Sequence, residues 1–198
     1  MNISMDLIKE LREKTSAGIV DCKKALEISN GNIEKAIDEL KKKGLATAQK
    51  KAGRSTAHGA IECYIHHDHT LGVMVEVNCE TDFVANTPKF RELAKKIAMQ
   101  IALDAPQFVS RESVPADILE KEKEIYRDQL KNEKKPENVI EKILEGKIEA
   151  YYKQVCLLDL PTMADPKMTV LDLIKDSVAT LQENITVRRF ARFKVAEV

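Results

Sequence analysis

The side chains that could do chemistry are concentrated in two short polar stretches. One is the run His66, His67, Asp68 and His69, in which every residue type can bind a metal. Successive residues of a strand point to opposite faces, and a turn commonly holds these residue types. A structural metal site needs about four converging ligands. We therefore interpret this run as a turn, and we expect neither a bound metal nor a cofactor.

The other stretch is 78–86, Asn-Cys-Glu-Thr-Asp-Phe-Val-Ala-Asn, which places Phe83 and Val84 among charged and amide-bearing side chains. It lies between the alternating apolar run 71–77 and a helical pattern that begins at Pro88, with Thr87 as its predicted N-cap. A strand end followed by a helix start presents side chains outward from a rigid base. From the residues alone, Phe83 either packs into the core or points at a partner.

Motifs of enzymes and nucleotide-binding proteins are missing from the sequence. It contains no Gly-x-x-x-x-Gly-Lys-Ser/Thr loop, no Gly-x-Gly-x-x-Gly and no Gly-x-Ser-x-Gly. The four cysteines form no Cys-x-x-Cys pair, and we interpret them as free, mostly buried thiols in a reducing compartment, with an intersubunit disulfide as the alternative. These patterns predict a protein that acts by binding and is not an enzyme.

Composition limits the possible partners. The 198 residues carry 32 basic and 32 acidic side chains, so the net charge of +0 predicts no overall polyanion-binding surface. No apolar run approaches the roughly 20 residues that span a bilayer, and the first residues lack the basic and apolar regions of a leader. We expect a soluble cytoplasmic protein that does not bind a membrane.

Residues 4–44 have the pattern of three short helices. Ser4 is a predicted N-cap of the first, Asn32 of the third, and Gly44 follows Lys41–Lys43 as the predicted end of the third. The second helix begins near Ile19, directly after Gly18. The apolar pair Ile19 and Val20 occupies the start of this helix, where polar capping residues are usual. The residues alone favour inward packing of this pair, with an exposed apolar lip for a partner as the alternative.

The rest of the chain has the pattern of a basic linker, 45–58, which can begin as a helix, and of an α+β core, 59–198. A period of two predicts a β-hairpin from 61–65 and 71–77, with one apolar face that the helix 88–101 covers. A helical hairpin at about 117–158 joined at Lys134-Lys135-Pro136, a helix after Thr169 and a last strand at 185–195 follow. The fold class is thus α+β, with a small antiparallel sheet packed against helices.

Basic residues provide one alternative function, RNA binding. They lie in the linker and on the last strand, where Phe190 accompanies them: Lys50, Lys51, Arg54, Arg188, Arg189 and Arg192. The three linker charges have no aromatic platform and would bind nucleic acid only weakly. On the last strand a solvated or interface face is favoured, so nucleic acid is not expected as a partner.

Several motifs resemble those of the bacterial elongation factor Ts family. The first is Leu-Ile-Lys-Glu-Leu-Arg-Glu-Lys-Thr at 7–15 followed by 17–18 and 21–26, and the second is Val-Asn-Cys-Glu-Thr-Asp-Phe-Val-Ala at 77–85. Further similarity lies at 135–147 and 186–193. The chain is similar to the short form of the family, without an extended coiled coil or a duplicated core, and its loop 160–163 departs from the commoner pattern.

The resemblance implies a guanine-nucleotide exchange factor that binds elongation factor Tu and has no direct contact with the nucleotide. It implies a UBA-like three-helix domain at 1–44, whose Arg12, Ile19 and Val20 contact the partner, which favours the exposed lip. The motif Thr81-Asp82-Phe83-Val84 is implied to dislodge the partner's Mg²⁺, with Phe83 at the surface. Short family members also pair, so a homodimer is expected. The alternative is a protein-binding adaptor that uses the three-helix domain alone.

Overall fold

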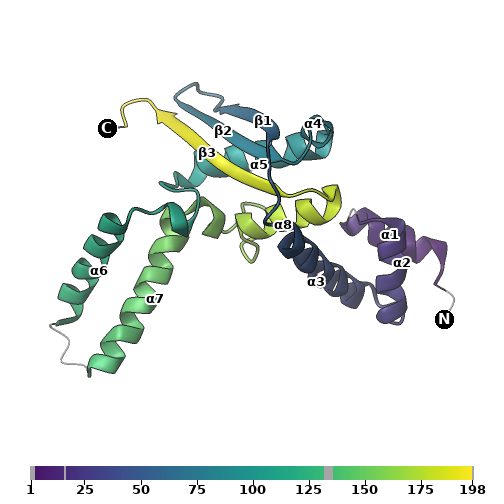
Figure 1. Ribbon diagram of the computed structural model, residues 1–198, viewed down its shortest axis with the longest axis horizontal. Coiled ribbons are helices and arrows are strands. Elements are labelled where there is room, and N and C mark those ends of the chain that lie inside the picture. Colours follow the sequence, from purple (N-terminus) through teal and green to yellow (C-terminus); the bar gives the residue numbers. More distant parts are fainter. Residues whose placement is uncertain (1–2, 16, 132–135, 198) are drawn as a thin grey trace. The chain divides into compact units, whose positions relative to one another are not determined.

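The computed structural model describes residues 3–15, 17–131 and 136–197, which form helices and one small sheet (Figure 1). The predicted α+β class is confirmed. The chain divides into two compact units, each described separately below. The first comprises Met1–Glu62, Glu76–Lys95 and Asp172–Val187, and the second comprises Cys63–Val75, Lys96–Leu171 and Arg188–Val198. The sheet and the helix Pro88–Asp104 contribute residues to both units.

The sheet contains three antiparallel strands, β1 (His58–Ile65), β2 (Leu71–Cys79) and β3 (Ile185–Lys194), in the order β1-β2-β3. The turn between β1 and β2 begins where the His66 N–H donates to the Leu71 carbonyl at 2.8 Å. Asp68 accepts a hydrogen bond from the Thr70 N–H at 3.0 Å, and His69 takes a left-handed φ of 59°. The polar run 66–69 is therefore a hairpin turn, as predicted.

Burial of the hairpin partly contradicts the sequence-based expectation of a single covered apolar face. Valines 73, 75 and 77 of β2 are buried, whereas Ile61, Cys63 and Ile65 of β1 are exposed. Pairing of His66 with Leu71 places Ile65 opposite Gly72, so the apolar residues of the two strands alternate onto opposite faces. Consistent with this register, a Cβ built on Gly72 would lie 3.0 Å from Ile65 Cδ1.

Three helices open the first unit, as predicted: α1 (Met5–Thr15), α2 (Ile19–Ile28) and α3 (Ile33–Lys51). Ser4 Oγ accepts from the Leu7 N–H at 3.3 Å, and Asn32 Oδ1 accepts from the Lys35 N–H at 2.9 Å, so both predicted caps form. The helices enclose a small apolar core of Ile8, Leu11, Cys22, Ala25, Leu26 and Ala36. The likeness to a UBA domain stays a prediction.

Helix α3 does not end at Gly44, and that prediction is wrong. The helix continues through Gly44, which is buried, to Lys51. A Cβ built on Gly44 would lie 3.2 Å from Ala179 Cβ on α8 (Val170–Leu181), so a glycine here allows close packing of the two helices. Residues 45–51 of the predicted linker are thus helical, which agrees with its expected helical start. The division of the chain into domains at 44 and 58 stays a prediction.

The first unit also contains α4 (Asp82–Ala85) and the start of α5 (Pro88–Asp104). Thr87 Oγ1 accepts from the Phe90 N–H at 3.3 Å, which confirms Thr87 as the cap that precedes Pro88. The buried apolar residues of this part come from the end of β2, from α4, α5 and α8, and from the start of β3: Val77, Cys79, Ala85, Phe90, Leu93, Ala94, Ile174, Val178 and Ile185.

The second unit contains the predicted pair of helices, α6 (Ala116–Lys131) and α7 (Glu137–Val155), which lie side by side (Figure 1). Lys134 and Lys135 of their predicted joint lie outside the described residues. Helix α7 ends three residues before the predicted Leu158, because Cys156 forms a parallel bridge with Phe108 and the Leu157 N–H donates to the Phe108 carbonyl at 2.9 Å.

Arg111 joins the segment before α6 to α7 and to the segment that follows α7. It lies in a 3₁₀ turn, Arg111–Ser113, and donates to both carboxylate oxygens of Glu149 at 2.7 and 2.9 Å. Its Nε donates to Asp159 at 2.8 Å, and its guanidinium lies 4.9 Å from the centre of the Tyr152 ring. A planar, forked cation can satisfy two carboxylates and an aromatic face together.

Gly59 allows β1 to approach β2 closely. Its φ is +155°, and a Cβ built on it would lie 2.3 Å from the Val77 carbonyl oxygen. We predict that Gly59→Ala lowers the free energy of unfolding by at least about 2 kcal/mol, measured by urea denaturation. Gly53→Ala is the matched control, because nothing lies within 4 Å of a Cβ at that glycine. Equal effects of the two substitutions would contradict the assigned close approach.

Candidate functional site

The stretch Thr81–Val84 forms one closed helical turn directly after β2. Thr81 has an extended backbone (φ −129°, ψ 156°), and its Oγ1 accepts from the Val84 N–H at 3.4 Å. At the other end, the N–H and the side-chain amide of Asn86 both donate to the Asp82 carbonyl, at 3.1 and 3.0 Å. Thr87 Oγ1 donates to the Val84 carbonyl at 2.8 Å. Side chains therefore satisfy backbone groups at both ends of α4.

Phe83 points away from the protein. Its side chain is 82% exposed, Asp82 is also exposed, Val84 is half-buried and Ala85 is buried. The turn is thus held by its inner side and presents the phenyl ring outward. The residues alone left the direction of Phe83 open, and the structure shows that the ring does not pack into the core of the first unit.

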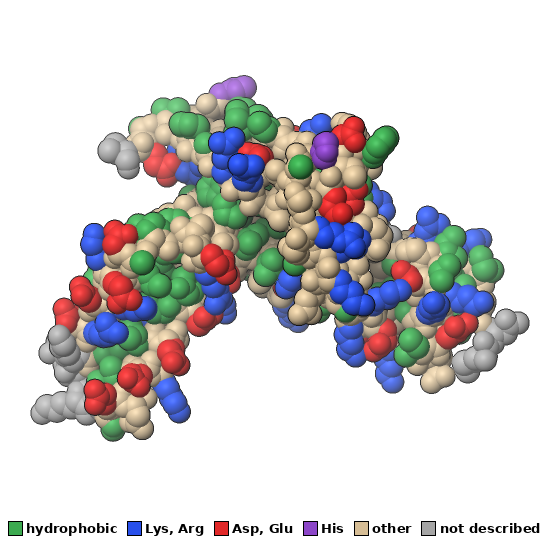
Figure 2. All heavy atoms as spheres, viewed as in Figure 1, with side chains coloured by type: hydrophobic (Ala, Val, Ile, Leu, Met, Phe, Trp, Pro, Cys, Tyr) green, Lys and Arg blue, Asp and Glu red, His purple; other side chains and the backbone are tan. Residues whose placement is uncertain are grey.

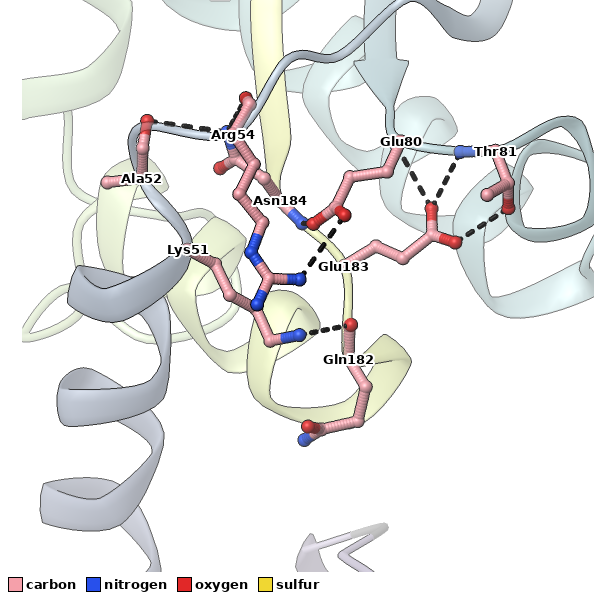
Figure 3. A network of polar contacts seen from close by, with 8 residues as sticks. All are labelled: Lys51, Ala52, Arg54, Glu80, Thr81, Gln182, Glu183 and Asn184. Carbon is pink, nitrogen blue, oxygen red and sulfur yellow. Dashed lines mark hydrogen bonds and ion pairs between the residues drawn. The ribbon is translucent and has the colours of Figure 1, made fainter.

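A carboxylate from a distant part of the chain holds the start of this turn (Figure 3). Glu183, between α8 and β3, accepts three hydrogen bonds, from the Glu80 N–H at 3.1 Å, the Thr81 N–H at 3.0 Å and the Thr81 hydroxyl at 2.6 Å. Both oxygens of its carboxylate are used. Hydrogen bonds to an ionised group are among the stronger ones in proteins.

Glu80 makes the reverse connection (Figure 3). Its carboxylate accepts from the Asn184 N–H at 2.7 Å and from Arg54 at 3.4 Å. The Asn184 N–H, and after it the Arg54 guanidinium, lower the pKa of Glu80 below its usual value, because both stabilise the ionised carboxylate. Two glutamates therefore join the end of β2 to the segment before β3 in both directions.

The segment after α3 joins the same network. The buried side-chain amide of Asn184 donates to the Arg54 carbonyl at 2.9 Å and to the Ala52 carbonyl at 3.4 Å. Lys51 donates to the Gln182 carbonyl at 2.5 Å. Sequence reasoning missed Glu183 and Asn184, which lie about a hundred residues after the motif and carry no motif of their own. The one sequence signal that could have indicated them is that two polar residues lie next to each other between a predicted helix and a predicted strand.

The cysteine nearest the turn is structural. Cys79 is buried, and its thiol lies 3.1 Å from the Thr81 carbonyl. Burial, and next the charge of Glu183, raise the pKa of Cys79, which keeps it a thiol at neutral pH. Cys22 and Cys156 are also buried, and burial raises the pKa of Cys156 to about 11. Cys63 is exposed, so the thiols are free and mostly buried, as expected.

The structure places the second group of predicted site residues on α1 and α2. Arg12 is exposed, Ile19 is about half exposed and Val20 is 64% exposed. Inward packing of Ile19 and Val20, which the residues alone favoured, is therefore wrong. Helix α2 buries Cys22, Ala25 and Leu26. With 3.6 residues per turn, Val20 lies on the opposite side of the helix from this stripe, while Ile19 stands at its exposed end.

Among the basic residues considered for RNA binding, several are engaged with the protein itself. Lys51 and Arg54 bond within the network of the first unit. In the second unit, Arg192 is 13% exposed, pairs with Glu197 and donates to the Ala102 carbonyl at 3.4 Å. Acidic and basic side chains are interspersed over α6 and α7 (Figure 2). Three of the six basic residues considered for RNA binding, Lys51, Arg54 and Arg192, are thus engaged in contacts within the protein.

The part of the chain that the structure describes contains no group of three or more His, Cys, Asp or Glu side chains placed to hold a metal ion. His66 contacts the Tyr64 hydroxyl at 2.9 Å instead. Likewise, none of the helices within the described ranges has an apolar stretch long enough to cross a bilayer.

The geometry defines a class of protein that presents apolar side chains for binding: a braced turn offers Phe83 and a helix start offers Ile19 and Val20. Comparison with known proteins identifies the family. The family model described as "Elongation factor TS" matches residues 4–197. The chain belongs to the elongation factor Ts family, whose members are translation elongation factors.

Curated relatives support this assignment over the whole chain. "Elongation factor Ts" of Fervidobacterium nodosum is 55% identical over 197 residues, which cover 100% of this chain and 100% of the relative. The protein of the same name from Caldanaerobacter subterraneus subsp. tengcongensis is 56% identical, with 98% of each chain covered. That of Thermotoga maritima is 55% identical over 100% of this chain and 98% of its own.

The exposure of Phe83 predicts that the ring is dispensable for folding. Phe83→Ala should change the free energy of unfolding by less than about 0.5 kcal/mol in urea denaturation, because little contact is lost. Phe90→Ala serves as the matched comparison. Phe90 is fully buried, and its truncation should cost about 3–5 kcal/mol. A loss from Phe83→Ala comparable to that from Phe90→Ala would show that the ring packs in the core.

Proposed function

We propose that this protein is a guanine-nucleotide exchange factor, which binds elongation factor Tu·GDP, displaces its Mg²⁺ and promotes GDP release in the cytoplasm. The observation that carries the proposal is the outward-pointing Phe83 on a turn closed at both ends, in a chain of the elongation factor Ts family. The factor binds its partner protein, makes no contact with the nucleotide and forms no covalent bond.

The chemistry of Mg²⁺ makes such a ring effective. Mg²⁺ demands nearly ideal octahedral oxygen geometry and bridges nucleotide phosphates to few protein ligands. A small displacement of those ligands is therefore enough to release it. In the proposed complex, Phe83 inserts between side chains of the partner, while Thr81, Asp82 and Val84 hold the adjacent segment.

Exchange then follows from linkage between two binding events. A factor that binds the nucleotide-free partner best lowers the partner's affinity for GDP, and GDP weakens the factor's own binding by the same ratio. A coupling of about 3 kcal/mol corresponds to roughly 150-fold in each affinity. The factor is released when nucleotide binds again.

The apolar lip on α2 supplies affinity in this proposal. Arg12, Ile19 and Val20 dock the three-helix domain on the partner, and their exposure supports this role. The alternative is a protein-binding adaptor that uses this domain alone. The two differ in one requirement: an exchange factor needs both the lip and Phe83 to act on one partner.

We predict that Phe83→Ala lowers the maximal rate of GDP release from elongation factor Tu by about 10²-fold, measured by stopped flow with a fluorescent GDP analogue. The factor concentration that gives half of this rate should change little, because one ring is removed from a larger interface.

Val20→Asp is the complementary variant. It places a charge in the proposed docking surface, so it should raise the half-maximal concentration and leave the maximal rate nearly unchanged. Stimulated release that is equal for Phe83→Ala and the unsubstituted protein would refute the assigned role. An adaptor would show no stimulated release with any variant.

A second copy of the chain is also proposed as a partner. In the second unit, Cys63, Ile65, Met74 and Phe193 are exposed on the sheet, and Phe193 is 74% exposed. The Val195 N–H donates to the Thr70 carbonyl at 2.8 Å, a register that puts Phe193 beside Gly72, on the side that Ile65 and Met74 share. A contiguous exposed apolar face of this kind is typical of an interface, and Cys63 is the thiol that an intersubunit disulfide would use.

Sedimentation equilibrium tests the homodimer. We expect a dimer at micromolar concentration for the unsubstituted chain and a monomer for Phe193→Glu, because a carboxylate buried in an apolar interface is costly. Phe83→Ala removes a similarly exposed ring from another surface and should remain dimeric. A monomer for the unsubstituted chain, or a dimer for Phe193→Glu, would contradict the proposed interface.

A further inference from the structure

We propose that Glu183 is a positioning residue for nucleotide exchange, which acts together with Glu80 as a reciprocal brace that keeps the turn carrying Phe83 stiff. The inference rests on the proposed function of Phe83. Its structural part, the immobilisation of the turn by Glu183, can be tested without the partner protein.

The first step is the way Glu183 holds the turn. Its carboxylate receives the Glu80 N–H, the Thr81 N–H and the Thr81 hydroxyl, so both oxygens are committed to one short segment. These donors lie immediately before α4. A half-buried carboxylate with three donors fixes both the position and the direction of the backbone that enters the turn.

The second step connects the carboxylate to the residue next to Phe83. The Thr81 hydroxyl donates its only hydrogen to Glu183 at 2.6 Å. Its oxygen lone pair is then directed toward the Val84 N–H, from which it accepts at 3.4 Å. Glu183 therefore orients the capping hydroxyl of α4, and Phe83 lies between the two residues that this hydroxyl connects.

The third step is that Glu183 itself is held. The preceding Gln182 takes a left-handed φ of 59°, its N–H donates to the Val178 carbonyl at 2.9 Å and its carbonyl accepts from Lys51 at 2.5 Å. The following Asn184 is 5% exposed and donates its N–H to Glu80 at 2.7 Å. Each glutamate thus accepts a backbone N–H from the segment that carries the other.

Hydrogen bonds in both directions make the turn more rigid. The Phe83 ring can displace side chains of a partner only when the turn that carries it does not move. A four-residue turn has little rigidity of its own, because so few hydrogen bonds close it. The brace connects the turn to the end of α3 and to the α8–β3 junction within the same unit (Figure 3). Loosening it should reduce the rate of exchange at saturation more than the affinity for the partner.

The decisive variant is Glu183→Gln, which keeps the size of the side chain, removes its charge and replaces one acceptor oxygen by a donor. We expect the maximal rate of stimulated GDP release to fall about tenfold, with the half-maximal factor concentration changed less than twofold. Glu149→Gln is the matched control, since this glutamate also accepts strong hydrogen bonds but pairs with Arg111 in the second unit. It should leave the rate unchanged.

A double variant separates positioning from general damage. If Glu183 acts through the ring, Phe83→Ala combined with Glu183→Gln releases GDP no more slowly than Phe83→Ala alone. If the two losses multiply, Glu183 acts elsewhere and the proposal is overturned. Thr81→Val, which removes the capping hydroxyl, should reproduce the effect of Glu183→Gln. Thr81→Ser, which keeps the hydroxyl, should release GDP at the normal rate. Circular dichroism and thermal unfolding establish that each variant is folded.

A spectroscopic measurement tests the brace without elongation factor Tu. The sequence contains no tryptophan, so Phe83→Trp introduces a single fluorophore at the ring position. Time-resolved anisotropy should show faster local motion of this indole when Glu183→Gln is added, and unchanged motion with Glu149→Gln. Equal anisotropy in all backgrounds overturns the brace. Increased motion in a protein whose GDP release is insensitive to Phe83→Ala refutes the role of Phe83, and with it the role of the brace in exchange.

Discussion

The hydrogen bonds between the Glu183 carboxylate and the backbone of Glu80 and Thr81 are the constraint on which the candidate site depends. They join two segments that are about a hundred residues apart in the chain. A solvent-exposed aromatic ring gains nothing for stability by pointing outward, so its direction must be imposed by the backbone beneath it. The carboxylate imposes it by fixing the start of α4 and by orienting the hydroxyl of Thr81, which caps the turn.

Exposed apolar side chains recur in this protein, and each group is supported by a rigid element. Phe83 stands on the braced turn, Ile19 and Val20 begin a helix with a packed inner face, and Phe193 and Ile65 lie on paired strands. A chain that leaves so many large apolar side chains exposed is suited to binding other proteins. This pattern agrees with membership of the elongation factor Ts family and with a function exerted through association.

Local patterns in the sequence predicted most of the secondary structure. Ser4, Asn32 and Thr87 were identified as caps because their side chains bond to backbone groups only three residues away, and all three do so. The hairpin turn at 66–69 was predicted for the same reason. Gly44 was misread as a helix end, since a glycine that ends a helix and one that lets α8 approach look alike in sequence. The covered face of β1 was also misassigned, because pairing register depends on the partner strand.

The same distinction, between features set by neighbouring residues and features set by distant ones, applies to the candidate site. The resemblance of its motifs to the elongation factor Ts family implied site roles for Thr81–Val84, Arg12, Ile19 and Val20, whereas neighbouring residues by themselves predicted only a turn between the end of a strand and the start of a helix. The residues alone left the direction of Phe83 open and favoured an inward lip, so the folded chain decided both exposures. It alone shows the hydrogen bonds of Glu183. Each depends on which distant groups meet. A carboxylate 102 residues after Thr81 carries no local signal of its partner until packing brings the two together.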